Sequence, residues 1–64
     1  MRINGQEYAL TKVMSLQELL EEQGYRSSLV AVELNGAIVK RSEYDSTMLT
    51  AEDKLEIVSF VGGG

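Results

Sequence analysis

The sequence has 64 residues, a formal net charge of −4 and 44% hydrophobic residues, as expected for one small acidic domain. It contains no cysteine or histidine, which excludes disulfides and thiolate or imidazole metal ligands, and we expect no bound metal. The negative charge opposes nucleic-acid binding, and no apolar run approaches the ~18 residues that a membrane span requires. Polar residues follow Arg2 in place of a secretory signal, so we expect a cytoplasmic protein with no nucleic-acid or membrane partner.

The first predicted element is a β-hairpin. Asn4-Gly5 favours the tight turn whose twist matches that of paired strands. We therefore expect a short strand over residues 1–3 and a longer strand over residues 7–13.

An amphipathic helix is predicted next. Ser15-Leu-Gln-Glu18 has the spacing of a capping box, in which the serine and glutamate side chains bind the amides at a helix start. Leu16, Leu19 and Leu20 then follow at helical spacing and predict a buried face. Gly24 can adopt the left-handed conformation that ends a helix.

A second hairpin follows at Asn35-Gly36, joining strands over residues 30–34 and 37–39. Alternation predicts a core face made by Val30, Val32 and Leu34. The neighbouring Lys40-Arg41 pair is interpreted as solvated residues at the sheet edge that discourage further strand pairing.

Residues 41–50 are polar and irregular, and they form a long connection with room for a short helical turn. We expect Tyr44, Met48 and Leu49 to anchor this connection against the core.

The last predicted strand covers residues 55–61 and has apolar residues on both faces. Leu55 and Ile57 share one face, which a sheet covered by one helix would bury. Val58 and Phe60 share the other face and, with Val61, are candidates for a partner interface. The alternative is that Val58 and Phe60 pack under the 41–50 connection.

This order of elements predicts an α+β fold with one main helix against a mixed sheet of four to five strands. The right-handed crossover rule places the last strand beside the first, in the middle of the sheet. The arrangement is that of ubiquitin-like β-grasp domains, and we expect residues 1–61 to form the domain and residues 62–64 a flexible tail.

The three glycines at positions 62–64 are the most unusual feature of the sequence. Such an end can be a linker or a cloning remnant. Because glycine has no Cβ, Gly62 and Gly63 can also enter a channel too narrow for side chains and leave the Gly64 carboxyl carbon accessible. The tail reaches about 10 Å, far enough to enter another protein's active site.

A carboxylate at Gly64 becomes an acyl donor only after activation, most simply as a mixed anhydride with AMP formed from ATP. The chain has no phosphate-binding motif, histidine base or cysteine nucleophile, so the activating machinery must belong to a partner. We therefore expect a substrate of other enzymes, with no cofactor of its own and no catalytic residue.

Four segments together resemble the ThiS family of thiamine-biosynthesis sulfur carriers: Val30-Ala-Val-Glu-Leu-Asn-Gly36, Ile38-Val-Lys-Arg41, Leu55-Glu-Ile-Val58 and Val61-Gly-Gly-Gly64. The resemblance spans nearly the whole chain. It implies that a ThiF-type enzyme adenylates Gly64 and that a persulfide-bearing sulfurtransferase then converts the acyl adenylate to a thiocarboxylate. It also implies that thiazole synthase takes the sulfur for the thiazole ring of thiamine, with ATP and the sulfur donor used by the partner enzymes.

Other functions fit the same pattern. Sulfur carriers for molybdopterin, tRNA thiolation or amino-acid synthesis share the fold and the glycine end, and a ubiquitin-like interaction module would leave the glycines without a role. A small enzyme built on Glu21-Glu22 or Glu52-Asp53 is disfavoured, because adjacent carboxylates in a strand or helix point apart.

Overall fold

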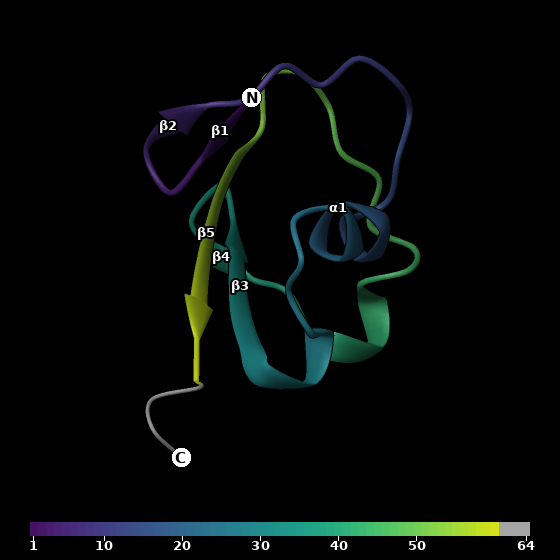
Figure 1. The fold of residues 1–64 in the computed structure, drawn as a ribbon, viewed down its shortest axis with the longest axis vertical. Coiled ribbons are helices and arrows are strands. Elements are labelled where there is room, and N and C mark those ends of the chain that lie inside the picture. Colours follow the sequence, from purple (N-terminus) through teal and green to yellow (C-terminus); the bar gives the residue numbers. More distant parts are fainter. Residues whose placement is uncertain (61–64) are drawn as a thin grey trace.

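A mixed five-stranded sheet and one α-helix make up the two layers of the protein, whose computed structural model describes residues 1–60. The strands are β1 (Arg2–Ile3), β2 (Gln6–Glu7), β3 (Val30–Leu34), β4 (Ala37–Ile38) and β5 (Lys54–Ser59). The helix α1 (Leu16–Glu22) lies on one side of this sheet (Figure 1). Two 3₁₀ turns, Ser27–Leu29 and Arg41–Glu43, occupy the connections.

The last strand, β5, is the centre of the sheet. The strand order is β2-β1-β5-β3-β4, with β5 parallel to β1 and antiparallel to β3. The longest ladder joins β5 to β3 and runs from the Val30–Ser59 pair to the Leu34–Leu55 pair. The predicted α+β arrangement, with the last strand beside the first, is confirmed.

The helix begins and ends at the predicted residues. Ser15 Oγ accepts a hydrogen bond from the Glu18 amide at 3.1 Å, and Glu18 Oε1 accepts one from the Ser15 amide at 2.8 Å. This reciprocal capping box satisfies two amides that a helix start leaves free. After α1, Gly24 adopts φ +85, the left-handed conformation that ends the helix.

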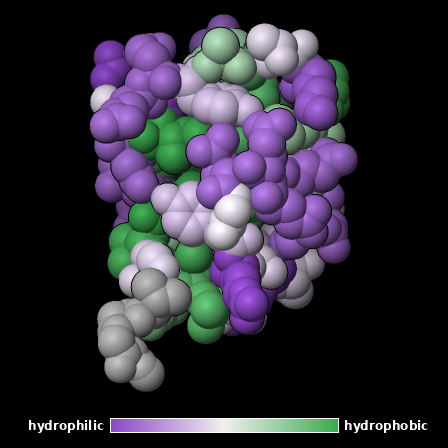
Figure 2. Space-filling view, in the orientation of Figure 1, coloured by the Kyte–Doolittle hydropathy of each residue, from purple (hydrophilic) through white to green (hydrophobic). Residues whose placement is uncertain are grey.

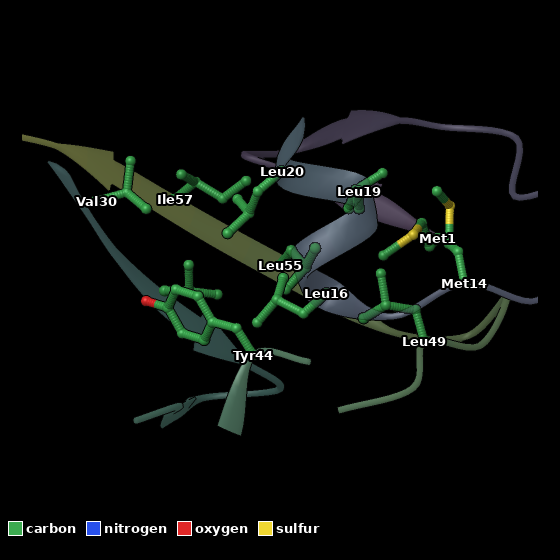
Figure 3. Packing of buried hydrophobic residues seen from close by; sticks show 11 residues of the cluster. Met1, Met14, Leu16, Leu19, Leu20, Val30, Tyr44, Leu49, Leu55 and Ile57 are labelled. Carbon is green, nitrogen blue, oxygen red and sulfur yellow. The ribbon is translucent and has the colours of Figure 1, made fainter. Parts of the chain in front are cut away.

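The core lies between α1 and the sheet, as Figure 3 shows. The three leucines of α1 are fully buried and face β5 and β3. The other buried hydrophobic residues are Met1, Met14, Val30, Val32, Tyr44, Leu49, Leu55 and Ile57. In a domain this small, nearly every one of these side chains contributes to a single core.

The 41–50 connection is anchored by two of the three predicted residues. Tyr44 and Leu49 are buried, but Met48 is 50% exposed, so the prediction for Met48 was wrong. Met48 forms an isolated antiparallel bridge with Ser15. Successive side chains in extended backbone point to opposite sides, so inward Leu49 places Met48 outward.

The second strand of the first hairpin ends at Glu7 and not at residue 13. Backbone pairing continues only to Tyr8, whose amide donates to the Met1 carbonyl at 3.0 Å. β1 covers only Arg2–Ile3, so the hairpin ladder is short, and Val13 is 83% exposed. The Tyr8 hydroxyl donates a hydrogen bond to Glu22, which is the main reason that the pKa of Tyr8 is raised.

The asparagines of both hairpin turns bind the central strand. Asn4 and Asn35 have φ 51 and 53, the left-handed backbone of the predicted turns. The Asn4 side chain accepts from the Ile57 amide at 2.7 Å and donates to the Ile57 carbonyl at 3.3 Å. The Asn35 side chain accepts from the Lys54 amide at 2.9 Å and donates to Asp53 Oδ1 at 2.9 Å. Turn residues on both sides of β5 therefore fix its position.

We expect the substitution Asn4→Asp to destabilise the fold by about 1–3 kcal/mol, since it places a carboxylate oxygen against the Ile57 carbonyl and removes a donor. Urea unfolding measures the change. Gln6→Glu is the matched control: it adds the same charge at an exposed strand residue and is expected to stay within about 0.5 kcal/mol. Equal unfolding midpoints for the two variants would contradict the role assigned to Asn4.

Candidate functional site: the open sheet face and the end of β5

The end of β5 places two of the predicted interface residues at the surface. Val58 and Phe60 are each 59% exposed, whereas Leu55 and Ile57 of the same strand are buried under α1. This alternation puts Val58 and Phe60 on the sheet face opposite the helix. They do not pack under the 41–50 connection, so the structure decides between the two alternatives in favour of exposure.

Backbone pairing holds the chain in the sheet up to the last described residue. Val58 is directly opposite Ala31 of β3, and the Phe60 amide donates to the Leu29 carbonyl at 2.7 Å. Phe60 is therefore fixed by the sheet although its side chain is exposed. The remaining predicted site residues, Val61, Gly62, Gly63 and Gly64, lie outside the described residues, and the division into a domain and a tail stays a prediction.

We use the term open sheet face for six residues of β3, β4, β5 and the position after β5 that point away from α1. They are Ala31, Glu33, Ile38, Glu56, Val58 and Phe60. Figure 2 shows hydrophobic surface near the end of β5 that is lower in Figure 1. Ile38, on β4, is 74% exposed and lies opposite Glu33. Sequence reasoning missed Ala31, Glu33, Ile38 and Glu56, because they join this face only through strand register.

Three of the four carboxylates considered for a small enzyme accept hydrogen bonds within the fold. Glu21 accepts from Gln17 at 2.9 Å, and Glu22 accepts from Tyr8. Asp53 accepts from Asn35 and, at 2.8 Å, from the Thr50 amide. No three histidine, cysteine, aspartate or glutamate side chains within residues 1–60 are grouped to hold a metal ion.

The predicted basic pair at the sheet edge has a structural role that the sequence did not reveal. Arg41 is exposed, yet its guanidinium donates to the Ser27 carbonyl at 2.8 Å and to the Val30 carbonyl at 3.1 Å. It thereby ties the connection after β4 to the start of β3.

None of the helices formed by residues 1–60 has the length and apolar character needed to cross a membrane.

Comparison with known proteins assigns the family. The model of the ThiS family matches residues 1–64, the full length of the chain. The chain belongs to the ThiS family. The sulfur carrier protein ThiS of Bacillus subtilis is 34% identical to this ThiS-family chain over 65 residues, which cover 100% of the chain and 98% of that protein.

A longer relative contains a segment similar to this ThiS-family chain. A thiazole synthase of Paramagnetospirillum magneticum is 47% identical over 62 residues, which cover 97% of this chain and only 19% of that protein.

A crystal structure of the thiamine biosynthesis protein ThiS from Geobacter metallireducens matches with a TM-score of 0.81 and 30% identity, covering 98% of this chain and 96% of that one. The predicted ubiquitin-like β-grasp fold is thus confirmed.

Proposed function

We propose that the chain is a sulfur carrier whose Gly64 carboxylate is adenylated and then converted to a thiocarboxylate that donates sulfur for the thiazole ring of thiamine. One observation carries the proposal. The central strand β5 delivers an exposed Val58 and Phe60 to the surface immediately before the sequence Val61-Gly-Gly-Gly64. In the sequence, a protein surface that partners can contact is thus followed, after Val61, by three residues without side chains.

The proposed chemistry requires an activating partner. The Gly64 carboxylate oxygen attacks the α-phosphorus of ATP and releases pyrophosphate, which leaves an acyl adenylate. The terminal sulfur of a partner's persulfide then displaces AMP from the acyl carbon and forms an acyl disulfide. A thiolate of the partner cleaves its S–S bond, which releases the thiocarboxylate and leaves a disulfide between that thiol and the sulfur donor. Glycine at positions 62 and 63 gives the enzyme access to that carbon because no Cβ lies beside the backbone. The chain acts as the substrate in each step, and ATP and the sulfur donor belong to the partners.

The folded body supplies the affinity in this proposal. Fixing three glycine backbones costs about 1–2 kcal/mol each, and glycines contribute no side-chain contacts in return. The exposed Val58 and Phe60, with Val61, are the candidate residues that offset this cost by contacting the partner. The acidic net charge steers the carrier toward basic partner surfaces.

A ThiF-type adenylating enzyme, a sulfurtransferase or other persulfide donor, and thiazole synthase are the proposed partners. Support for the last comes from the thiazole synthase of Paramagnetospirillum magneticum, in which a segment similar to this chain forms part of the same polypeptide. A thiazole synthase of Magnetococcus marinus contains such a segment at 37% identity. We propose a cytoplasmic location, where ATP is available to these enzymes.

Intact-mass spectrometry tests the proposal. The chain is incubated with the adenylating enzyme of its own organism, ATP and a persulfide donor, and we expect a mass gain that corresponds to one oxygen replaced by sulfur. Omitting ATP is the control and is expected to leave the mass unchanged. An unchanged mass in the complete reaction would favour the alternative, a ubiquitin-like interaction module without acyl chemistry.

A further inference from the structure

Two glutamates face each other on the open sheet face. Glu33 of β3 and Glu56 of β5 are directly opposite residues in the antiparallel ladder, and both are exposed. Like charges in this position destabilise a sheet. The one ion pair among the described residues joins Arg2 and Glu7, so neither glutamate forms an ion pair there. Lys54, two residues before Glu56 on the same strand face, is the basic side chain beside the pair, and it leaves the two carboxylates with one positive charge between them.

The surroundings of the pair indicate contact with a protein. The next pair of the ladder on the same sheet face is apolar, formed by Ala31 and Val58, and exposed Ile38 lies opposite Glu33 on the other side. A surface hollow lined by both glutamates, Asn35, Gly36 and Lys54 adjoins them. Apolar residues next to two like charges and a surface hollow are typical of an interface in which a partner side chain enters the hollow.

The chemistry of the pair favours an arginine as that side chain. A planar guanidinium carries five donors and can bind two carboxylates at once, which a lysine ammonium does less specifically. A divalent cation is a poorer fit, because calcium takes six to eight oxygen ligands and no group of three acidic side chains exists within residues 1–60.

We propose that Glu33 and Glu56 together bind an arginine of thiazole synthase, while Val58 and Phe60 contact apolar residues beside it. The inference rests on the proposed function and adds to it the charge that the partner must present. Thiazole synthase is the chosen partner because two thiazole synthases contain a carrier-like segment in the same polypeptide, an arrangement that keeps the two close to each other. The glutamate pair thus sets the position of the carrier on the synthase, with apolar contacts nearer the glycines.

The proposal predicts opposite effects on the free protein and on the complex. In the free protein, Glu33→Gln and Glu56→Gln remove a repulsion, so the thermal unfolding midpoint is expected to stay equal or rise. In the complex, each variant removes half of the arginine site. We expect at least roughly tenfold weaker binding for the double variant, mainly through faster dissociation.

Calorimetry with the full-length chain and the thiazole synthase of its own organism, without ATP or sulfur donor, measures this binding. Glu43→Gln, at an exposed residue of the Arg41–Glu43 turn outside the sheet, is the matched control and is expected to bind like the wild type. Raising the salt concentration is expected to weaken wild-type binding more than binding of the double variant. Wild-type affinity in the double variant, or the same loss in Glu43→Gln, would overturn the proposal.

Three further outcomes separate this inference from the proposed function. If the double variant loses affinity for the adenylating enzyme and keeps its affinity for thiazole synthase, the assignment of the partner is wrong. If Gly64 acquires sulfur and the double variant binds thiazole synthase with wild-type affinity, the carrier function stands and the arginine site is refuted. Loss of synthase binding in the double variant, with no sulfur ever gained by Gly64, would support the arginine site and refute the carrier chemistry.

Discussion

Appending one alanine after Gly64 is expected to lower the rate of sulfur incorporation by about 100-fold or more. The added residue converts the proposed reactive carboxylate into a neutral peptide carbonyl, which has no anionic oxygen to attack ATP, and it moves the terminal carboxylate one residue farther along the chain. Gly63→Val leaves the carboxylate in place but puts a branched side chain beside the acyl carbon. A displacement of about 1 Å at a reacting centre can cost about 100-fold, so we expect a comparable loss. Intact-mass spectrometry over time gives both rates.

Gly62→Ala provides a graded control for these two variants. It adds one carbon two residues from the proposed acyl carbon, so the loss is expected to be smaller than in Gly63→Val. Equal thermal unfolding midpoints would show that all three proteins keep a folded body. Incorporation of sulfur at the wild-type rate in the chain with the appended alanine would contradict the role of the Gly64 carboxylate.

The second large effect is expected from Leu19→Ala in the helix. Leu19 has 0% exposure and belongs to the single core between α1 and the sheet. Truncating a buried leucine costs about 2–5 kcal/mol, while a domain of this length has a total stability of roughly 3–10 kcal/mol. We therefore expect the variant either to be largely unfolded without denaturant or to unfold at a much lower urea concentration than the wild type. Circular dichroism during a urea titration measures this.

Val13→Ala is the matched control for the loss of apolar side-chain carbons. Val13 is 83% exposed, so its truncation is expected to change the free energy of unfolding by less than about 0.5 kcal/mol. If Leu19→Ala retained the wild-type urea midpoint, the core between α1 and β5 would not be the main source of stability.

The features that the sequence predicted well follow local rules. The capping box needs only Ser15 and Glu18 three residues apart, and the Asn-Gly turns need only two adjacent residues. The bonds from the asparagine side chains to β5 could not be predicted in the same way. Asn4 binds Ile57, 53 residues away, so this contact depends on strand order as well as on turn type.

The incorrect predictions arose where tertiary context overrides a local pattern. The sequence predicts a strand through residue 13, but β1 covers only Arg2–Ile3 and its ladder with β2 includes no residue beyond Glu7. Met48 is apolar like its neighbour Leu49, yet only one of two adjacent extended residues can face the core. Neither outcome changes the position of β5.

The candidate site was predictable only in part. Alternation along the last strand indicated an outward Val58 and Phe60, and the structure confirms that both are exposed. Glu33 lies opposite Glu56 because of the register between β3 and β5, and the residue pattern within one strand does not determine that register. The proposed reactive residue, Gly64, lies outside the described residues and stays a prediction from the sequence and the family.

Tracing a heavy sulfur isotope tests the central claim most directly. The chain, the adenylating enzyme, ATP and a labelled persulfide donor are combined, and thiazole synthase with its small substrates is added afterwards. We predict that the label first appears in the peptide ending at Gly64, leaves it when the synthase is added, and is recovered in the thiazole product. Labelled thiazole formed equally well without this chain, or label that remains on Gly64 in the presence of an active synthase, would contradict the assignment to thiamine synthesis.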